Sequence, residues 1–121
     1  MEGQEQLRLI ATITAAAAIL AIPAAAHSAS DHRSKLRKTV HPCLAKIIDR
    51  ENPGWDPRVW NRQGSGAYGL PQALPASKMA SAGRDWRTNP KTQIRWMIRY
   101  VNSRYGGACQ ALAYHNRHGW Y

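Results

Sequence analysis

One amphipathic stretch decides the fold, residues 40–54, which read VHPCLAKIIDRENPG. Its apolar positions recur at intervals of three and four residues, as along one face of an α-helix. They are Val40, Cys43, Leu44, Ile47 and Ile48. Pro42 suits the first turn of such a helix, and Asn52-Pro53-Gly54 ends it. The pattern predicts a core-facing helix, and Glu51 continues its apolar face in the last turn.

Glu51 is the first candidate for a functional residue. Burial disfavours the charged form of a carboxyl group, and the negative end of the helix dipole acts in the same direction. The position therefore favours a protonated acid, which is the form that a general acid catalyst needs. The alternative is an exposed glutamate of the last turn with no function. The other signals in the chain favour the catalytic interpretation.

The N-terminal region differs from the rest of the chain. From Leu7 to Ala26 no residue after Arg8 is charged, and the run ends in Ala24-Ala25-Ala26. This is typical of a secretory signal peptide, and we expect cleavage after Ala26 or Ala29. A retained N-terminal membrane anchor is the alternative, because the apolar run is long enough. The expected organisation is a signal peptide over residues 1–29, a flexible basic lead over 30–40 and one folded domain over 41–121.

The two cysteines, Cys43 and Cys109, form the only possible pair. In a small exported domain an even number of cysteines favours a disulfide, which would close a span of 66 residues. A metal site built from these cysteines and the histidines is the alternative. The chain has no CxxC or HxxxH grouping, so we expect no metal and no other cofactor.

The charge balance points to an acidic partner. Residues 30–121 contain 16 Lys and Arg against 5 Asp and Glu, a net charge of +11, and Glu51 is their only glutamate. Such a charge favours attraction to nucleic acid, to a membrane surface or to an anionic cell wall. An exported protein meets the last two far more often. Charge alone does not choose between them, and we expect no nucleic-acid partner.

Two further helices are expected after the central loop. Asn89-Pro90 is typical of a helix start, and apolar residues follow at helical spacing until Gly106-Gly107. The next helix runs from Ala108 to about Asn116. Pairing of its cysteine with Cys43 would bring Tyr114, His115 and Asn116 into the range of Glu51. The chain as a whole predicts a mainly helical domain.

The loop over residues 52–69 is rich in glycine and proline, which excludes a long regular element but allows a small hairpin. Trp55, Trp60 and Tyr68 alternate there with arginine, asparagine and glutamine side chains. Flat rings beside hydrogen-bonding groups suit a sugar polymer, which offers C–H faces and hydroxyl edges. For each ring taken alone, a place in the core is the better interpretation.

Several of these segments together resemble the soluble lytic transglycosylase (SLT) family of lysozyme-like domains, in its short secreted bacterial form. The resemblance covers residues 47–121. It rests on Glu51 with Trp55-Asp56-Pro57, on Ser65-Gly66-Ala67-Tyr68-Gly69-Leu70-Pro71-Gln72, on Asp85-Trp86-Arg87-Thr88-Asn89-Pro90 and on His118-Gly119-Trp120-Tyr121. The chain departs from the family pattern at Asn52, where a serine is usual, and at Pro71, where many members have methionine. The family's Ala-Tyr-Asn signature is blurred into Ala113-Tyr114-His115-Asn116.

The resemblance implies a lysozyme-like α+β fold and cleavage of peptidoglycan glycan strands. Glu51 would protonate the bond between N-acetylmuramic acid and N-acetylglucosamine, and the product would be a 1,6-anhydromuramoyl sugar. Tyr68 and Gln72 would orient substrate, together with Tyr114 or His115 and with Asn116. The expected protein is a secreted monomer that binds glycan strands and anionic cell-wall polymers.

Two other functions remain open. The first is a lysozyme-type muramidase, in which Asp56 or another group activates water, because glycosidases usually need two carboxylates. The second is a non-catalytic, cationic protein that binds the cell wall or a membrane.

Overall fold

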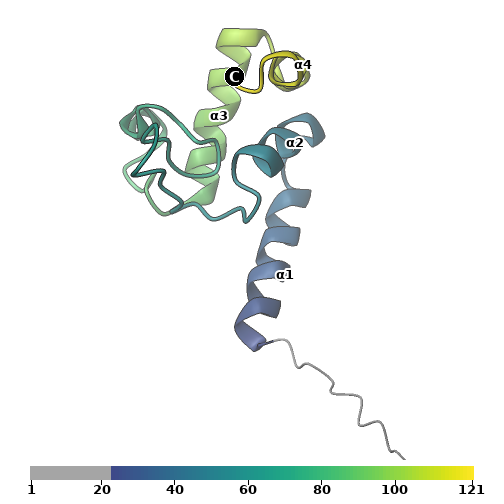
Figure 1. Ribbon diagram of the computed structural model, residues 1–121, viewed down its shortest axis with the longest axis vertical. Helices are drawn as coiled ribbons and strands as arrows, with labels where there is room; N and C mark the ends of the chain where they lie inside the picture. Colours follow the sequence, from purple (N-terminus) through teal and green to yellow (C-terminus); the bar gives the residue numbers. More distant parts are fainter. Residues whose placement is uncertain (1–22) are drawn as a thin grey trace, which may run out of the picture.

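The computed structural model describes residues 23–121 and contains five helical segments (Figure 1). They are α1 (Ala24–Lys38), α2 (Pro42–Glu51), the 3₁₀ helix η1 (Ala76–Ala82), α3 (Pro90–Tyr105) and α4 (Ala108–His118). The prediction of a mainly helical domain is confirmed. Within residues 23–121 there is no strand, and the loop makes only two isolated antiparallel bridges, Trp60 with Tyr68 and Tyr68 with Ala73.

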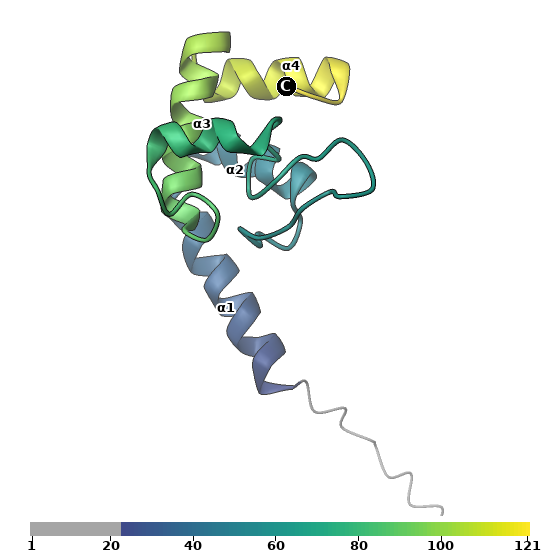
Figure 2. The same cartoon turned by 90° about the vertical axis from the view of Figure 1, so that its left-hand side faces the viewer.

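The core lies between α2, α3, α4 and η1. From α2, Leu44, Ile47 and Ile48 are at most 1% exposed, as the helical spacing predicts. Met97 of α3 and Met79 of η1 meet the same core and have no exposed surface. Figure 2 shows α4 lying across the end of α3, so that the last two helices close one side of the core.

The helix starts follow the sequence signals. The imidazole Nδ1 of His41 accepts a hydrogen bond from the backbone N–H of Cys43 at 3.1 Å and so caps α2. The side chain of Asn89 accepts from the N–H of Lys91 at 2.9 Å and caps α3, which confirms the Asn89-Pro90 signal. Gly106 ends α3 with a φ of 85°, a left-handed conformation that suits glycine.

Residues 30–40 differ from the flexible lead expected for them, because α1 runs through this segment to Lys38. The segment is held at its C-terminal end, where Leu36 and Val40 are each only 8% exposed. Arg37 also forms an ion pair with Asp49 of α2, with 2.7 Å between Nη2 and Oδ2. Residues 23–35, which precede this anchored end, are exposed, and Figure 1 shows α1 projecting from the domain.

Most of the expected signal peptide, residues 1–22, lies outside the described residues. The possible cleavage sites after Ala26 and Ala29 fall within α1. Among the helices of residues 23–121, none has the length and apolar character needed to cross a membrane.

Two buried amides hold the long loop between α2 and η1. Asn52 donates from Nδ2 to the carbonyls of Asp56 at 2.7 Å and Gly69 at 3.1 Å. Gln93 of α3 accepts from the N–H of Leu70 at 2.9 Å. Its Nε2 donates to the carbonyls of Pro57 and Trp86. A Cβ atom on Gly69 would lie 2.6 Å from Oε1 of Gln93, so this close approach requires glycine.

The sulfurs of Cys43 and Cys109 form a disulfide, as predicted, and it joins the first turns of α2 and α4. Because it closes a span of 66 residues, the chain-entropy model gives it about 4 kcal/mol of stability. The double variant Cys43→Ser/Cys109→Ser should therefore lose roughly that amount in the free energy of unfolding. Urea denaturation of both proteins measures the difference, and equal midpoints and slopes would contradict this account.

Asp49 makes the junction of α1 and α2 sensitive to pH. The Arg37 guanidinium holds the pKa of Asp49 below its ordinary value, and the indole N–H of Trp55 acts in the same direction. A lowered folded-state pKa gives stability that is present above the unfolded value, about 3.9, and is lost as the pH falls through the folded value. Because the pair is partly exposed, the contribution should be at most about 1 kcal/mol.

Asp49→Asn should therefore be less stable than the wild type at pH 7, and the two proteins should converge at acidic pH. Urea denaturation between about pH 2 and about pH 7 tests this, because that range spans the ordinary pKa of an aspartate carboxyl group. Asp31→Asn, on the exposed part of α1, is the matched control. A pH profile of Asp49→Asn parallel to that of the wild type would contradict the assignment.

Candidate functional site

Glu51 lies in the last turn of α2, and its carboxyl group faces α4. Oε1 of Glu51 lies 2.7 Å from Nε2 of His115. The Glu51 side chain is 24% exposed and the His115 side chain 7% exposed. The carboxyl group is therefore neither fully buried nor on an open surface: one oxygen is held by the protein, and a part of the side chain is reachable from solvent.

The hydrogen bonds around His115 assign its tautomer. Arg50 points Nη1 at Nδ1 of His115, at 3.4 Å. A guanidinium group can only donate, so Nδ1 must accept and cannot carry a proton. The ring proton is then on Nε2 and is donated to Glu51. The resulting chain, from Arg50 through His115 to Glu51, presents a neutral imidazole N–H to the carboxyl group. The sequence interpretation of Glu51 included burial and the helix dipole but not this donor.

Asn116 is connected to His115 and Glu51 through Arg50, because its Oδ1 accepts a hydrogen bond from the Arg50 guanidinium group. Of the residues expected on α4, the structure thus brings His115 into contact with Glu51 and brings Asn116 into contact with its neighbour Arg50. Tyr114 faces elsewhere: its ring stacks on His118, with 4.0 Å between centroids, and packs against Tyr105. Between Tyr114 and His115, it is His115 that lies beside Glu51.

The C-terminal residue, Tyr121, belongs to the site although it was not assigned a role from the sequence. Its hydroxyl donates to the carbonyl of Pro71 at 2.6 Å, and its ring lies 6.1 Å from that of His115. Burial raises the pKa of Tyr121 well above its ordinary value, and the nearby Glu51 carboxylate adds to the rise. Tyr121 therefore links the segment around Pro71 to the region of Glu51.

A second link runs through the carbonyl of Gly69. This oxygen accepts from Nδ2 of Asn52, the residue after Glu51, and from Nε2 of Gln72 at 3.0 Å. Gln72 also has a φ of 52°, a conformation that is uncommon outside glycine, and its side chain folds back on its own turn. The structure thus anchors the Gly-Leu-Pro-Gln segment near the end of α2 and gives Gln72 a local partner.

Tyr68 lies in a separate pocket of about 470 Å³ with Trp60 and Trp86. Its hydroxyl donates to the carbonyl of Arg87 at 2.6 Å, and its ring contacts Trp86 edge-on. Trp60 is 51% exposed at the rim. Trp55, in contrast, is 2% exposed and belongs to the core. Glu51 lines neither this pocket nor four other pockets of residues 23–121.

The aspartates that could assist Glu51 have other partners. Asp49 is bonded to Arg37 and Trp55. Asp85 accepts from Thr92 and Asn89, which hold its pKa below the ordinary value. Asp56 accepts from the backbone N–H of Arg58 at 2.9 Å.

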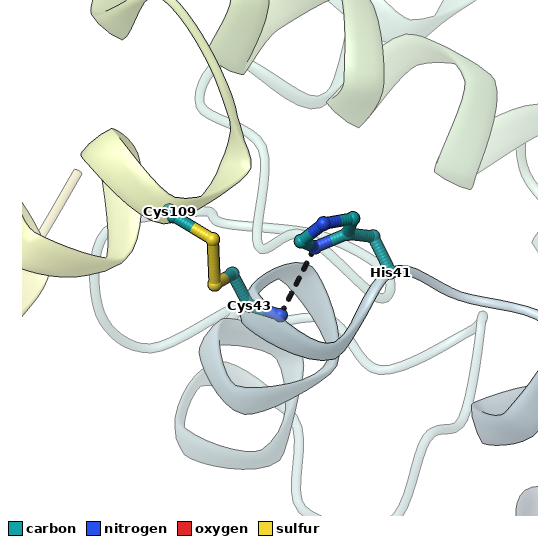
Figure 3. A group of neighbouring side chains, drawn as sticks. All are labelled: His41, Cys43 and Cys109. Carbon is teal, nitrogen blue, oxygen red and sulfur yellow. Dashed lines mark hydrogen bonds between the residues drawn. A yellow bond between two sulfur atoms is a disulfide. The ribbon is translucent and has the colours of Figure 1, made fainter.

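One group of possible metal ligands lies where α2 meets α4. His41, Cys43 and Cys109 bring their ligand atoms within 4.8 Å of one another (Figure 3). Both sulfurs are used in the disulfide, and Nδ1 of His41 caps α2. A disulfide sulfur is not a thiolate, which is the form that binds metals. In its oxidised form this cluster is therefore a structural element of the α2–α4 junction.

Comparison of the chain with models of protein families, with curated proteins and with solved structures finds no significant match.

The contact between His115 and Glu51 should contribute to stability. His115→Leu removes the donor and leaves both Glu51 and Arg50 without this partner, which should cost about 1–3 kcal/mol. His115→Gln can still donate through its amide, so its free energy of unfolding should lie closer to the wild type. Urea denaturation of the three proteins provides the measurement. Equal losses for leucine and glutamine would show that packing, and not the hydrogen bond, stabilises this position.

Proposed function

We propose that the protein is a secreted, monomeric lytic transglycosylase with a lysozyme-like domain, which acts on peptidoglycan glycan strands. The observation that carries the proposal is the position of Glu51. It is the only glutamate of residues 30–121, it ends the core helix α2, and one of its oxygens is held by His115. The family resemblance of residues 47–121 adds the reaction and the substrate.

The first step needs a proton on Glu51. Because Oε1 accepts the N–H of His115, the free oxygen, Oε2, is the atom that would carry the acidic proton. In this arrangement His115 orients the carboxyl group and is not itself consumed. Oε2–H would protonate the glycosidic oxygen between N-acetylmuramic acid and N-acetylglucosamine. The bond from C1 to that oxygen then breaks, and positive charge develops at C1 of the muramoyl sugar.

The second step uses a nucleophile of the substrate. The C6 hydroxyl of the same muramoyl sugar attacks C1, and Oε2 of Glu51, now a carboxylate oxygen, takes the hydroxyl proton. The new C1–O6 bond closes a 1,6-anhydro ring, and Glu51 regains its proton. No water enters the products, so a single carboxyl group is sufficient for the whole reaction.

The surrounding aspartates favour this one-carboxylate chemistry over hydrolysis. A hydrolase usually uses a second carboxylate to activate water or to form a covalent intermediate. Asp49 and Asp85 are engaged in ion pairs or hydrogen bonds, and Asp56 caps the backbone of the loop. This supports transglycosylation over the muramidase alternative.

Substrate binding is assigned to the pocket of Trp60 and Tyr68 and to polar residues of the loop and of α4. The exposed ring of Trp60 and the edge of Tyr68 suit the C–H faces of sugar rings. Gln72, which donates to the carbonyl of Gly69, and Asn116, which accepts from Arg50, would add polar contacts from the loop and from α4. The net charge of +11 over residues 30–121 would hold the protein on an anionic wall.

The test is the release of soluble muropeptides from purified peptidoglycan by the disulfide-bonded protein. Glu51→Gln removes the acid but keeps a side chain that can accept from His115, so the fold should be unchanged and the release should be abolished. Asp56→Asn is the matched control and should retain activity. Mass spectrometry of the products should give 1,6-anhydromuramoyl ends.

The other outcomes contradict specific parts of the proposal. Products heavier by one water, together with an inactive Asp56→Asn variant, would assign the protein as a muramidase. Sedimentation with wall material without soluble products, unchanged in Glu51→Gln, would assign it as a non-catalytic wall-binding protein. Undiminished release by Glu51→Gln would remove Glu51 from the mechanism.

A further inference from the structure

Two surface pockets meet at Arg104, at the C-terminal end of α3. The first, of about 600 Å³, lies between η1 and α3 and is lined by Lys78, Arg99 and Arg104 among others. The second, of about 520 Å³, continues from Arg104 to Arg117 of α4. Arg104 lines both pockets, so they are neighbours on the surface, and we call the two together the cationic trough. It is defined by Lys78, Arg99, Arg104 and Arg117.

The charges of the cationic trough are not neutralised within the described part of the chain. Over residues 23–121, Arg37 pairs with Asp49, and the Glu51 carboxyl group contacts His115; no carboxylate pairs with a cation of the trough. All four cationic side chains of the trough belong to exposed residues. Their polar contacts are to neutral groups: Arg99 donates to the carbonyl of Ser81 and Arg104 to the hydroxyl of Tyr105. Four cations that line two neighbouring pockets favour the binding of a polyanion.

The aromatic rings beside the trough restrict which polyanion it fits. Trp96 and Tyr100 stack on each other, with 5.0 Å between centroids and 16° between planes. Tyr114 stacks on His118 in the same way. Proteins that bind single-stranded nucleic acids offer free ring faces to the bases. Here each stack covers one face of each ring, which reduces the ring surface that is open to bases.

What remains available in the trough suits a chain of phosphates and alcohols. Arginine side chains recognise phosphate groups through paired N–H donors. Ser81 and Ser103 add hydroxyl groups in the first pocket, and Gln110 adds an amide in the second. These neutral groups match the hydroxyl groups of a polyol, and they line the same pockets as the cations that match its phosphates.

We propose that the cationic trough binds a linear polyol-phosphate polymer, with successive phosphate groups on Lys78, Arg99, Arg104 and Arg117. This site is distinct from Glu51 and does not require glycosidic cleavage. It would retain the protein on a phosphate-bearing surface polymer while Glu51 works on a neighbouring strand.

The experiment measures binding of the full chain to synthetic poly(glycerol phosphate) by isothermal titration at several salt concentrations. Arg99→Gln/Arg104→Gln/Arg117→Gln is the trough variant. Arg58→Gln/Arg84→Gln/Lys91→Gln is the control, because it removes the same charge from exposed residues elsewhere. The trough variant should bind at least about tenfold more weakly than the wild type. The magnitude of its slope of log K against log salt should be smaller by about 2, because each of the three lost phosphate contacts contributes roughly 0.7. The control should change affinity less than threefold.

Three further arms make the result decisive. Arg99→Lys/Arg104→Lys/Arg117→Lys keeps the charge but loses the paired N–H donors, so its affinity should lie between that of the wild type and that of the trough variant. Glu51→Gln should bind like the wild type, which separates this site from the proposed catalytic one. Thermal unfolding of each variant confirms that it is folded.

Equal losses in the trough variant and in the control would overturn the proposal, since binding would then follow net charge alone. Equal or tighter binding of an oligothymidylate of the same charge, with the same sensitivity to the trough variant, would assign the trough to nucleic acid and overturn the polyol-phosphate assignment.

Discussion

The disulfide between Cys43 and Cys109 is the constraint on which the arrangement of the site depends. It joins the first turns of α2 and α4. From Cys43 to Glu51 is about 12 Å along α2, and from Cys109 to His115 about 9 Å along α4, at 1.5 Å per residue. Two helices fixed at their starts therefore carry Glu51 and His115 to similar heights, where their side chains meet at 2.7 Å. Arg50 and Asn116, the sequence neighbours of Glu51 and His115, form a second hydrogen bond between the two helices.

This geometry makes Glu51 an oriented carboxyl group. Fixing one oxygen by an imidazole N–H leaves the other as the only place for an added proton. A general acid works best when its proton points in one direction, because proton transfer needs hydrogen-bond distance and alignment. Tyr121 and Asn52 then tie the loop over residues 69–72 to the same region, through the carbonyls of Pro71 and Gly69. The end of α2 is thus the point at which the helical core and the loop meet.

The helices and their partners could be predicted from the sequence to a large extent. The spacing of apolar residues predicts α2, the Asn89 cap predicts α3, and pairing of the cysteines places α4 beside Glu51. The helix α1 was missed because residues 27–39 are polar. They are anchored by the burial of Leu36, by the contact of Arg37 with Asp49 and by the hydrogen bond from Arg33 to the carbonyl of Pro53. The expected α+β character was not found over residues 23–121, where the loop forms only isolated bridges.

The candidate site could be predicted only in part. Glu51, His115 and Asn116 come together as expected, but Tyr68 lies in a separate pocket and Tyr114 faces away. The roles of Asn52 and Gln93 could not be predicted, because their partners are backbone groups of distant loop residues, which leave no pattern in the sequence. Arg50 was missed for a related reason: its contacts depend on the rotation of α4 about its axis, which the residue spacing does not reveal.

The most direct test of this account is the ¹⁵N NMR spectrum of the His115 ring in the disulfide-bonded protein and in Cys43→Ser/Cys109→Ser. The account predicts a neutral ring with its proton on Nε2 in the bonded protein, and loss of this fixed tautomer when the sulfurs are removed. A ring protonated on Nδ1 in the bonded protein, or an identical spectrum in both proteins, would contradict it.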